Sequence, residues 1–149
     1  MKGRLTMEHK KMAVDCFNGT WDLIDKKDRS ETDTLKMIHM AHASRHHWGE
    51  IGTPLEWSRG EWQISRVYTL ANMGESALYH GKHALKYCLE NNIGDFDLAF
   101  AYESIARAYA VLENDDEKQM YKLKAQEASN GIEKKENLEY FLAELATIS

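Results

Sequence analysis

The chain has 149 residues, a net charge of -5 and 29% charged residues, which fits one globular domain and argues against a nucleic-acid-binding protein. Its mean hydropathy of -0.60 and the lack of any apolar run near ~20 residues predict no membrane span. The opening stretch MKGRLTMEHKKMAV has no uninterrupted apolar segment, so we expect no secretory signal. Cys16 and Cys88 lie 72 positions apart in no metal or redox spacing, which predicts free thiols in a reducing, cytoplasmic compartment.

A single proline and the scarcity of β-branched runs predict an all-helical chain. Apolar residues recur at helical spacing almost throughout the sequence. We expect Asp95 to be the N-cap of the fifth helix and Gly131 to break the chain before the last one. The pattern predicts helices over about residues 6–26, 33–48, 54–72, 75–90, 96–112, 117–129 and 133–146.

The boundary between the second and third helices carries the strongest local signal. Gly49 and Gly52 are expected to end the second helix, because glycine tolerates the left-handed conformation at a helix exit. Thr53 can cap the third helix, Pro54 suits its first position and Glu56 completes a capping box.

A sequence repeat with a period of 41 runs through these helices. Residues 64–68 (ISRVY) return as residues 105–109 (IARAY), and residues 39–43 (HMAHA) return as 80–84 (HGKHA) and, in degraded form, as 121–125 (YKLKA). Repeated helix pairs bury little alone and form one core when they are stacked. We therefore expect Tyr68 and Tyr109 to be largely buried at successive layers, and Ala84 to lie at a close helix crossing.

The repeat resembles the tetratricopeptide repeat (TPR). That family places a large apolar residue, a small residue and an aromatic residue on the first helix of each pair, as Ile64, Ser65 and Tyr68 do here. Two alanine-like positions follow on its second helix, matched by Ala77 and Ala84. The period of 41 differs from the family's 34, and the repeat-end proline is absent, so HEAT and armadillo repeats, with periods near 40–47, remain the alternative.

The resemblance implies an architecture and the location of a binding surface. We expect an all-α, α-α superhelix of about three helix pairs over residues 12–129, plus a C-terminal capping helix, as one TPR-like domain over residues 1–149. In such arrays the first helix of each pair lines a concave groove. By this resemblance, the ligand-binding positions are Arg59, Trp62, Arg66, Phe100, Glu103 and Arg107.

The arginines around this groove form an unusual set. Half of the chain's six arginines lie between residues 39 and 68, although no lysine occurs between Lys36 and Lys82. Arginine without lysine favours planar contacts with carboxylates or aromatic faces. Four-residue spacing predicts a cation–π pair of Trp62 with Arg66 and an ion pair of Glu103 with Arg107.

Arg66 and Arg107 occupy equivalent positions on adjacent layers, so they need an anion between them. That anion could be Glu103, Glu61 or a ligand carboxylate. The alternative is that the arginines only tie helices together. Chaperone-binding members of the family use a clamp rich in lysine and asparagine at such positions, and Trp62 and Arg66 depart from it.

The sequence therefore predicts a non-enzymatic interaction module that binds a protein, a peptide or a small acidic ligand, without a cofactor. Arg59, Arg66 and Arg107 would hold anionic groups, while Trp62 and Phe100 supply apolar contact. A homo-oligomer that uses an exposed repeat face is a further alternative.

The rival class is a small-molecule or metal-dependent enzyme, with its site in a histidine-rich window over residues 39–68. His42 and His46 have the i, i+4 spacing of helical zinc ligands, and Glu61 and Glu103 would be its acidic groups. Because second-helix positions tend to face the convex side, we expect no metal at these histidines.

Overall fold

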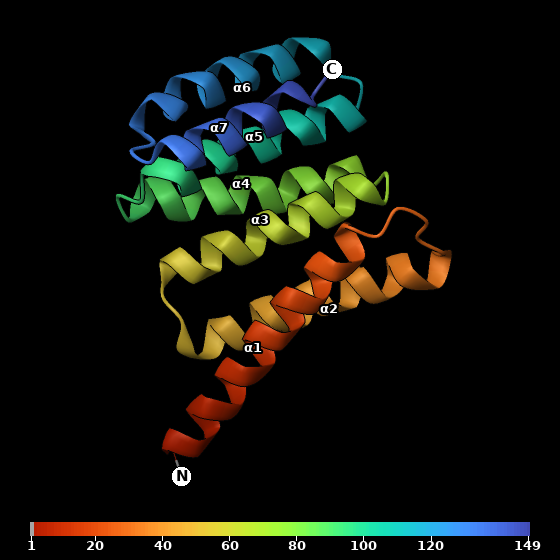
Figure 1. Ribbon diagram of the computed structural model, residues 1–149, viewed down its shortest axis with the longest axis vertical. Coiled ribbons are helices and arrows are strands. Elements are labelled where there is room, and N and C mark those ends of the chain that lie inside the picture. Colours follow the sequence, from red (N-terminus) through yellow and green to blue (C-terminus); the bar gives the residue numbers. More distant parts are fainter. Residues whose placement is uncertain (1) are drawn as a thin grey trace.

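The computed structural model describes residues 2–149 and folds them entirely into helices and connecting turns, with no β-strand in that range (Figure 1). The prediction of an all-helical fold is confirmed. None of the helices within these residues combines the length and apolar character that crossing a bilayer requires. The helices are α1 Lys2–Ile24, α2 Glu31–Ile51, α3 Pro54–Leu70, α4 Gly74–Glu90, α5 Asp95–Val111, α6 Asp115–Ala128 and α7 Lys135–Ala146, with a short 3-10 turn at Ser129–Gly131.

Local sequence accounts for most helix ends. Ser30 caps α2 through a reciprocal pair of bonds with Asp33, each 3.1 Å long, so that helix starts slightly before the position expected from periodicity. At α3, the Thr53 backbone N–H donates to Glu56 over 3.1 Å, as predicted. The prediction that Asp95 caps the fifth helix is wrong. Asp95 is the first residue of α5, and Gly94 is the cap residue.

The helix boundaries repeat with the period of the sequence. The first and last residues of α5 each lie one full period after those of α3, and the first residue of α6 lies one period after that of α4. The turns within these two pairs also match, because Asn72 and Glu113 both adopt the left-handed conformation, with φ of 60° and 58°. The period read from the sequence is therefore seen in both ends of α3 and α5 and in the first residues of α4 and α6.

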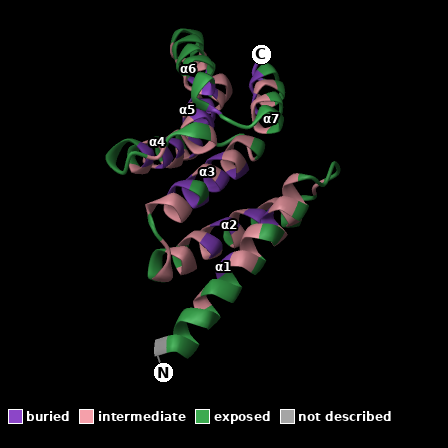
Figure 2. Ribbon diagram, turned by 60° about the vertical axis from the view of Figure 1, so that its left-hand side comes forward, coloured by how far each residue is buried: buried purple, intermediate pink, exposed green. Residues whose placement is uncertain are grey.

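Each helix packs on the next one in sequence from α1 to α6, and α3 also packs on α5. α7 turns back and lies alongside α5 (Figure 1). Buried residues concentrate from α2 to α5, whereas the first turns of α1 are exposed (Figure 2). One side of the molecule is thus formed by the first helix of each consecutive pair, namely α1, α3 and α5. α7 lies on the same side.

Small residues allow these helices to approach closely, as predicted. Ala84, Ser65, Ala106 and Ala125 are fully buried, although Ala43 is only partly so. A Cβ atom added at Gly81 of α4 would lie 2.9 Å from the Ser104 hydroxyl of α5, which shows how tightly these two helices pack.

The expected burial of Tyr68 and Tyr109 is only partly met, since both remain partly exposed. Tyr68 lies at the edge of its layer and bonds His42 through its hydroxyl over 2.8 Å. Tyr109 stacks on Tyr121 of α6, with ring centroids 5.8 Å apart. Both rings pack between helices, and burial raises the pKa of the Tyr109 hydroxyl.

Candidate functional site

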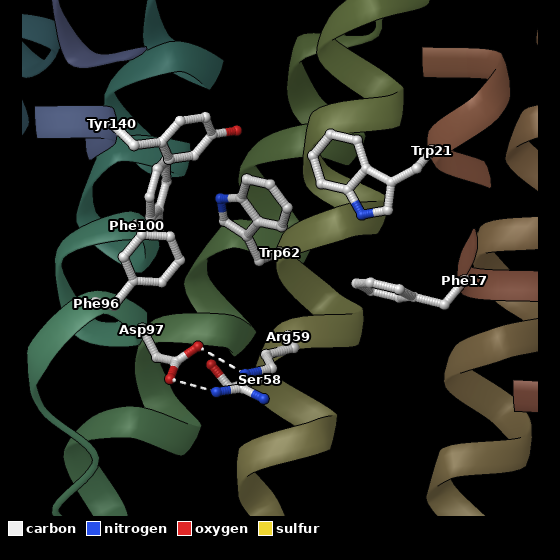
Figure 3. A pocket seen from close by; sticks show the side chains of 9 residues that line it. All are labelled: Phe17, Trp21, Ser58, Arg59, Trp62, Phe96, Asp97, Phe100 and Tyr140. Atoms are coloured by element: carbon white, nitrogen blue, oxygen red, sulfur yellow. Dashed lines mark hydrogen bonds and ion pairs between the residues drawn. The ribbon is translucent and has the colours of Figure 1, made fainter. Parts of the chain in front are cut away.

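A pocket of about 230 Å³ opens on the side shared by the first helices (Figure 3). Its walls come from α1, α3, α5 and α7, which contribute Phe17, Trp21, Ser58, Arg59, Trp62, Phe96, Asp97, Phe100 and Tyr140. An engineered cavity of roughly 150 Å³ is enough to hold benzene. The pocket therefore has room for one aromatic ring or one branched alkyl group.

Aromatic rings form most of the pocket wall. Trp62 lies between Trp21 and Phe100 in Figure 3, with ring centroids 5.6 Å and 5.5 Å away. Phe96 contacts Phe100 at 4.6 Å, and Tyr140 lies 5.9 Å from Phe100 at the outer edge. Four helices thus deliver rings to one space, and the rings leave a void instead of closing on one another.

Trp62 carries a polar atom that the fold leaves unsatisfied. Its indole nitrogen is buried and has no hydrogen-bond acceptor among the described residues. Figure 3 shows this nitrogen on the edge of the ring that faces Phe100 and Tyr140. An aromatic face is a weak acceptor at best, so the position of Trp62 is set by packing and not by a hydrogen bond.

Arg59 and Asp97 form the polar rim of the pocket. The Arg59 Nε and Nη2 atoms donate to the two Asp97 carboxylate oxygens over 2.9 and 3.1 Å. Such a bidentate pair is among the strongest that side chains make, although 52% of the Arg59 side chain is exposed. The charge of Arg59 is therefore balanced at the rim, and its Nη1 atom makes no hydrogen bond to any described residue.

Arg66 and Arg107 share a carboxylate of their own. Glu103 is fully buried between them, with one oxygen 2.6 Å from Arg107 Nε and the other 3.5 Å from Arg66 Nη2. Glu144 of α7 accepts from Arg66 at 3.3 Å, and its backbone carbonyl accepts from Arg107 at 3.0 Å. The two arginines and two glutamates form an internally neutral cluster that fastens α7 to α3 and α5.

Two predicted contacts in this cluster are confirmed, and one is wrong. Glu103 and Arg107 form the expected ion pair, and the Arg66 guanidinium lies 5.5 Å from the Trp62 ring centroid. Glu61 does not reach toward Arg66. It points to the other side of α3, where it accepts from Arg45 and His80 over 2.7 Å each.

The six predicted site residues fall into two groups. Arg59, Trp62 and Phe100 line the pocket, whereas Arg66, Glu103 and Arg107 belong to the neutral cluster.

The other residues that line the aromatic pocket were not predicted from the sequence as site residues. The four-residue spacings of Phe17 with Trp21, and of Phe96 with Phe100, place each pair on one helix face and could have indicated a shared wall. Tyr140 had no such signal, because it comes from the helix outside the repeat.

The histidine-rich window forms a separate hydrogen-bonded network. His42 Nε2 pairs with the Tyr68 hydroxyl at 2.8 Å, His80 pairs with Glu61, and the His42 and His80 rings lie 5.4 Å apart. Burial, then the charge of His80, lowers the pKa of His42, against an opposing effect of Glu61. His46 is exposed and packs against His47, so the expected i, i+4 pair does not act as one unit.

The residues proposed for the enzyme alternative lie in different surroundings. Glu61 joins the histidine network, whereas Glu103 is enclosed by Arg66 and Arg107. Within residues 2–149, no three histidine, cysteine or acidic side chains are grouped so that they could hold a metal ion.

No protein-family model matches the chain, and comparison with curated proteins and with solved structures finds no match. Arguments about function therefore rest on the chain's own geometry. The aromatic pocket, with its balanced Arg59–Asp97 rim, brings rings from four helices together, whereas Arg66 and Arg107 line another hollow of about 280 Å³.

Proposed function

We propose that this protein is a non-enzymatic binding module that takes a peptide segment of a partner protein against its concave side. One bulky apolar group of the peptide enters the aromatic pocket, and the flanking residues lie along α1 and α3. The observation that carries the proposal is the void of about 230 Å³ between aromatic rings from four helices. The pocket is open to solvent beside Arg59 and Tyr140, so an apolar group that enters it removes apolar ring surface from water.

The architecture we propose is a TPR-like stack of three helix pairs, with α7 as a cap. The boundaries of α3–α4 and α5–α6, which match at the period of the sequence repeat, support it. In this arrangement α1, α3 and α5 are the first helices of their pairs, and their shared side is the binding side. Both cysteines are free, in keeping with a cytoplasmic location.

The groove continues beyond the pocket. A second hollow of about 140 Å³ shares Phe17 and Arg59 with it and is completed by Val14, Asn18, Trp48 and Glu56. A peptide anchored in the pocket could extend into this hollow between α1 and α3. The Nη1 atom of Arg59, a residue that lines both hollows, offers a donor to a backbone carbonyl or carboxylate of the peptide.

The proposal places most of the binding energy on the apolar anchor and not on the arginines. Arg66 and Arg107 are occupied by Glu103 and Glu144, so an acidic ligand would have to compete with internal carboxylates for them. Burial of one aromatic or large aliphatic side chain is worth roughly 1.5–3 kcal/mol, and further contacts along the groove add to it.

Selection from a displayed library of random peptides tests the function. We expect the enriched peptides to share one bulky anchor residue and to lose binding to the Tyr140→Ala variant. Tyr79→Ala is the matched control, because Tyr79 is 62% exposed on α4, away from the pocket, while Tyr140 is 49% exposed at its edge. Peptides that bind both variants equally well, or a library that yields no binder, would refute the proposal.

A further inference from the structure

The charges around the pocket differ from those expected of an anion site. Arg59 is balanced by Asp97, and Arg66 and Arg107 are balanced by Glu103 and Glu144. The arginines that border the pocket thus leave no unpaired positive charge for a ligand.

A carboxylate without a partner lies on the same side of the molecule. Asp25, just beyond the end of α1, is exposed and makes no ion pair with any described residue. Its charge reaches the pocket edge: burial, then Glu144, Asp25 and Glu103, raise the pKa of Tyr140 against an opposing effect of Arg66. Asp25 is thus an exposed negative charge near Tyr140, and its effect on that pKa is smaller than the effects of Glu144 and Arg66.

Aromatic walls favour the same sign of charge. The face of an aromatic ring is negative and attracts cations, and tryptophan does so most strongly. Trp21 and Trp62 both border the pocket, and Trp62 already contacts the Arg66 guanidinium at 5.5 Å. A primary ammonium would lose its hydration in such a pocket, whereas an alkylated ammonium brings its own apolar methyl groups into contact with the rings.

We propose that the group bound in the aromatic pocket is a trimethylammonium head carried by a trimethylated lysine of the peptide partner. This inference rests on the proposed function and adds the chemistry of the anchor. The rings of Trp21, Trp62, Phe96 and Tyr140 surround the cation, and Asp25 adds a negative charge from beyond the end of α1. A peptide is favoured over a small free cation because the second hollow, beyond Phe17 and Arg59, continues the groove past the pocket.

Three small probes of nearly the same shape isolate the effect of charge. Choline is cationic, 3,3-dimethylbutan-1-ol is its neutral isostere and 3,3-dimethylbutanoate is an anionic counterpart. Binding is followed by the indole N–H signals of Trp21 and Trp62 in nuclear magnetic resonance spectra of the full chain. We expect choline to bind roughly tenfold tighter than the neutral alcohol, and the anion to bind most weakly.

The outcomes separate this inference from the proposed function. Equal binding of choline and the neutral alcohol would overturn the cation site but leave an apolar anchor pocket in place. If none of the probes shifts the indole signals and the peptide library yields no binder, both proposals fail. Preference for the anion would restore the acidic-ligand hypothesis.

A short peptide with one trimethyllysine tests the source of the cation. We expect it to bind at least about tenfold tighter than choline, because its neighbouring residues add contacts along the groove. The same peptide with unmodified lysine should bind much more weakly. A trimethyllysine peptide that binds no better than choline would show that the occupant is a small molecule and overturn this part of the proposal.

Asp25→Asn is the sharpest variant, because Asp25 is exposed and unpaired, so its loss leaves the fold intact. We expect it to weaken choline binding by about two- to fivefold at low salt and to leave binding of the neutral alcohol unchanged. Asp22→Asn, also exposed on α1, is the matched control and should change neither. Equal effects of the two variants on choline binding would contradict the role given to Asp25.

Discussion

Two regions on the side shared by α1, α3, α5 and α7 use arginine in opposite ways. In one region, Arg59 and Asp97 pair at an open rim, where 52% of the arginine side chain remains exposed. In the other region, Arg66 and Arg107 enclose Glu103, and α7 covers them with Glu144. On the single helix α3, the same residue type thus borders a pocket at Arg59 and fastens another helix at Arg66. Coverage by α7, not the arginine itself, decides the role.

The largest effect expected from this comparison is at Glu103. Glu103→Gln keeps the shape of the side chain but leaves Arg66 and Arg107 without their shared charge. Removing one partner from a buried ion pair costs about 3–5 kcal/mol, and the free energy of unfolding in urea should fall by that amount. Glu136→Gln, on the exposed face of α7, is the control and should change it by less than about 0.5 kcal/mol. A loss below about 1 kcal/mol at Glu103 would mean that the cluster is not structural.

Replacing Arg66 or Arg59 with glutamine compares the enclosed arginine with the arginine at the open rim. Arg66→Gln removes the ion pairs with Glu103 and Glu144, so we expect a loss of about 1–3 kcal/mol in unfolding free energy. Arg59→Gln breaks an exposed pair and should cost less than about 1 kcal/mol. Equal stabilities of the two variants in urea titrations would show that the enclosed pairs of Arg66 contribute no more to folding than the exposed pair of Arg59.

The histidine network predicts a smaller effect that depends on pH. The pKa of His42 is below its ordinary value of 6.5 in the folded chain, so the unfolded chain binds the proton first as the pH falls. Stability is therefore highest above pH 6.5 and decreases below it until His42 is protonated in both states. One such group changes the unfolding free energy by at most about 1.4 kcal/mol per pH unit.

Thermal or urea unfolding between pH 7.5 and 5.5 measures this slope. His42→Gln should reduce it, whereas His83→Gln, whose ring packs against Tyr79 on α4, serves as the control. A slope that is identical in the wild type and His42→Gln would remove His42 from the explanation.

The smallest effect on stability is expected from Asp97→Asn, at the open rim. Because its partner Arg59 is half exposed, the loss should stay below about 1 kcal/mol. The variant leaves the Arg59 charge unbalanced beside the pocket, so choline should bind more weakly and 3,3-dimethylbutanoate more tightly. Unchanged preference among the probes would show that the rim does not influence the charge of the pocket.

Several features of this protein could be predicted from short segments of sequence. The box at Thr53, Pro54 and Glu56 starts α3 where expected, because caps depend on residues three or four positions apart. The same spacing accounts for the Glu103–Arg107 ion pair and for the contact of Arg66 with Trp62. Helix ends that deviate from the expected positions do so by one residue, as at Asp95, to four residues, at the start of α1, which was expected at residue 6 and lies at Lys2.

Only half of the predicted site residues line the candidate pocket. Arg59, Trp62 and Phe100 follow from the sequence repeat, since equivalent positions on stacked pairs face the same side. Glu61, one of the three anions considered for Arg66 and Arg107, lies on the other side of α3. Its position in the sequence fits either neighbour, and the choice depends on where Arg45 and His80 lie in the folded chain.

The sequence by itself thus determined the helices, the cap of α3 and the repeat period. Only the tertiary structure decided which arginines are enclosed and which border an open rim, because that depends on where α7 docks after the turn at Ser129–Gly131. α7 lies outside the repeat, so no period positions Tyr140 at the pocket or Glu144 over Arg66. Contacts between segments far apart in sequence are set by packing of the whole core, in which Phe141 of α7 is fully buried.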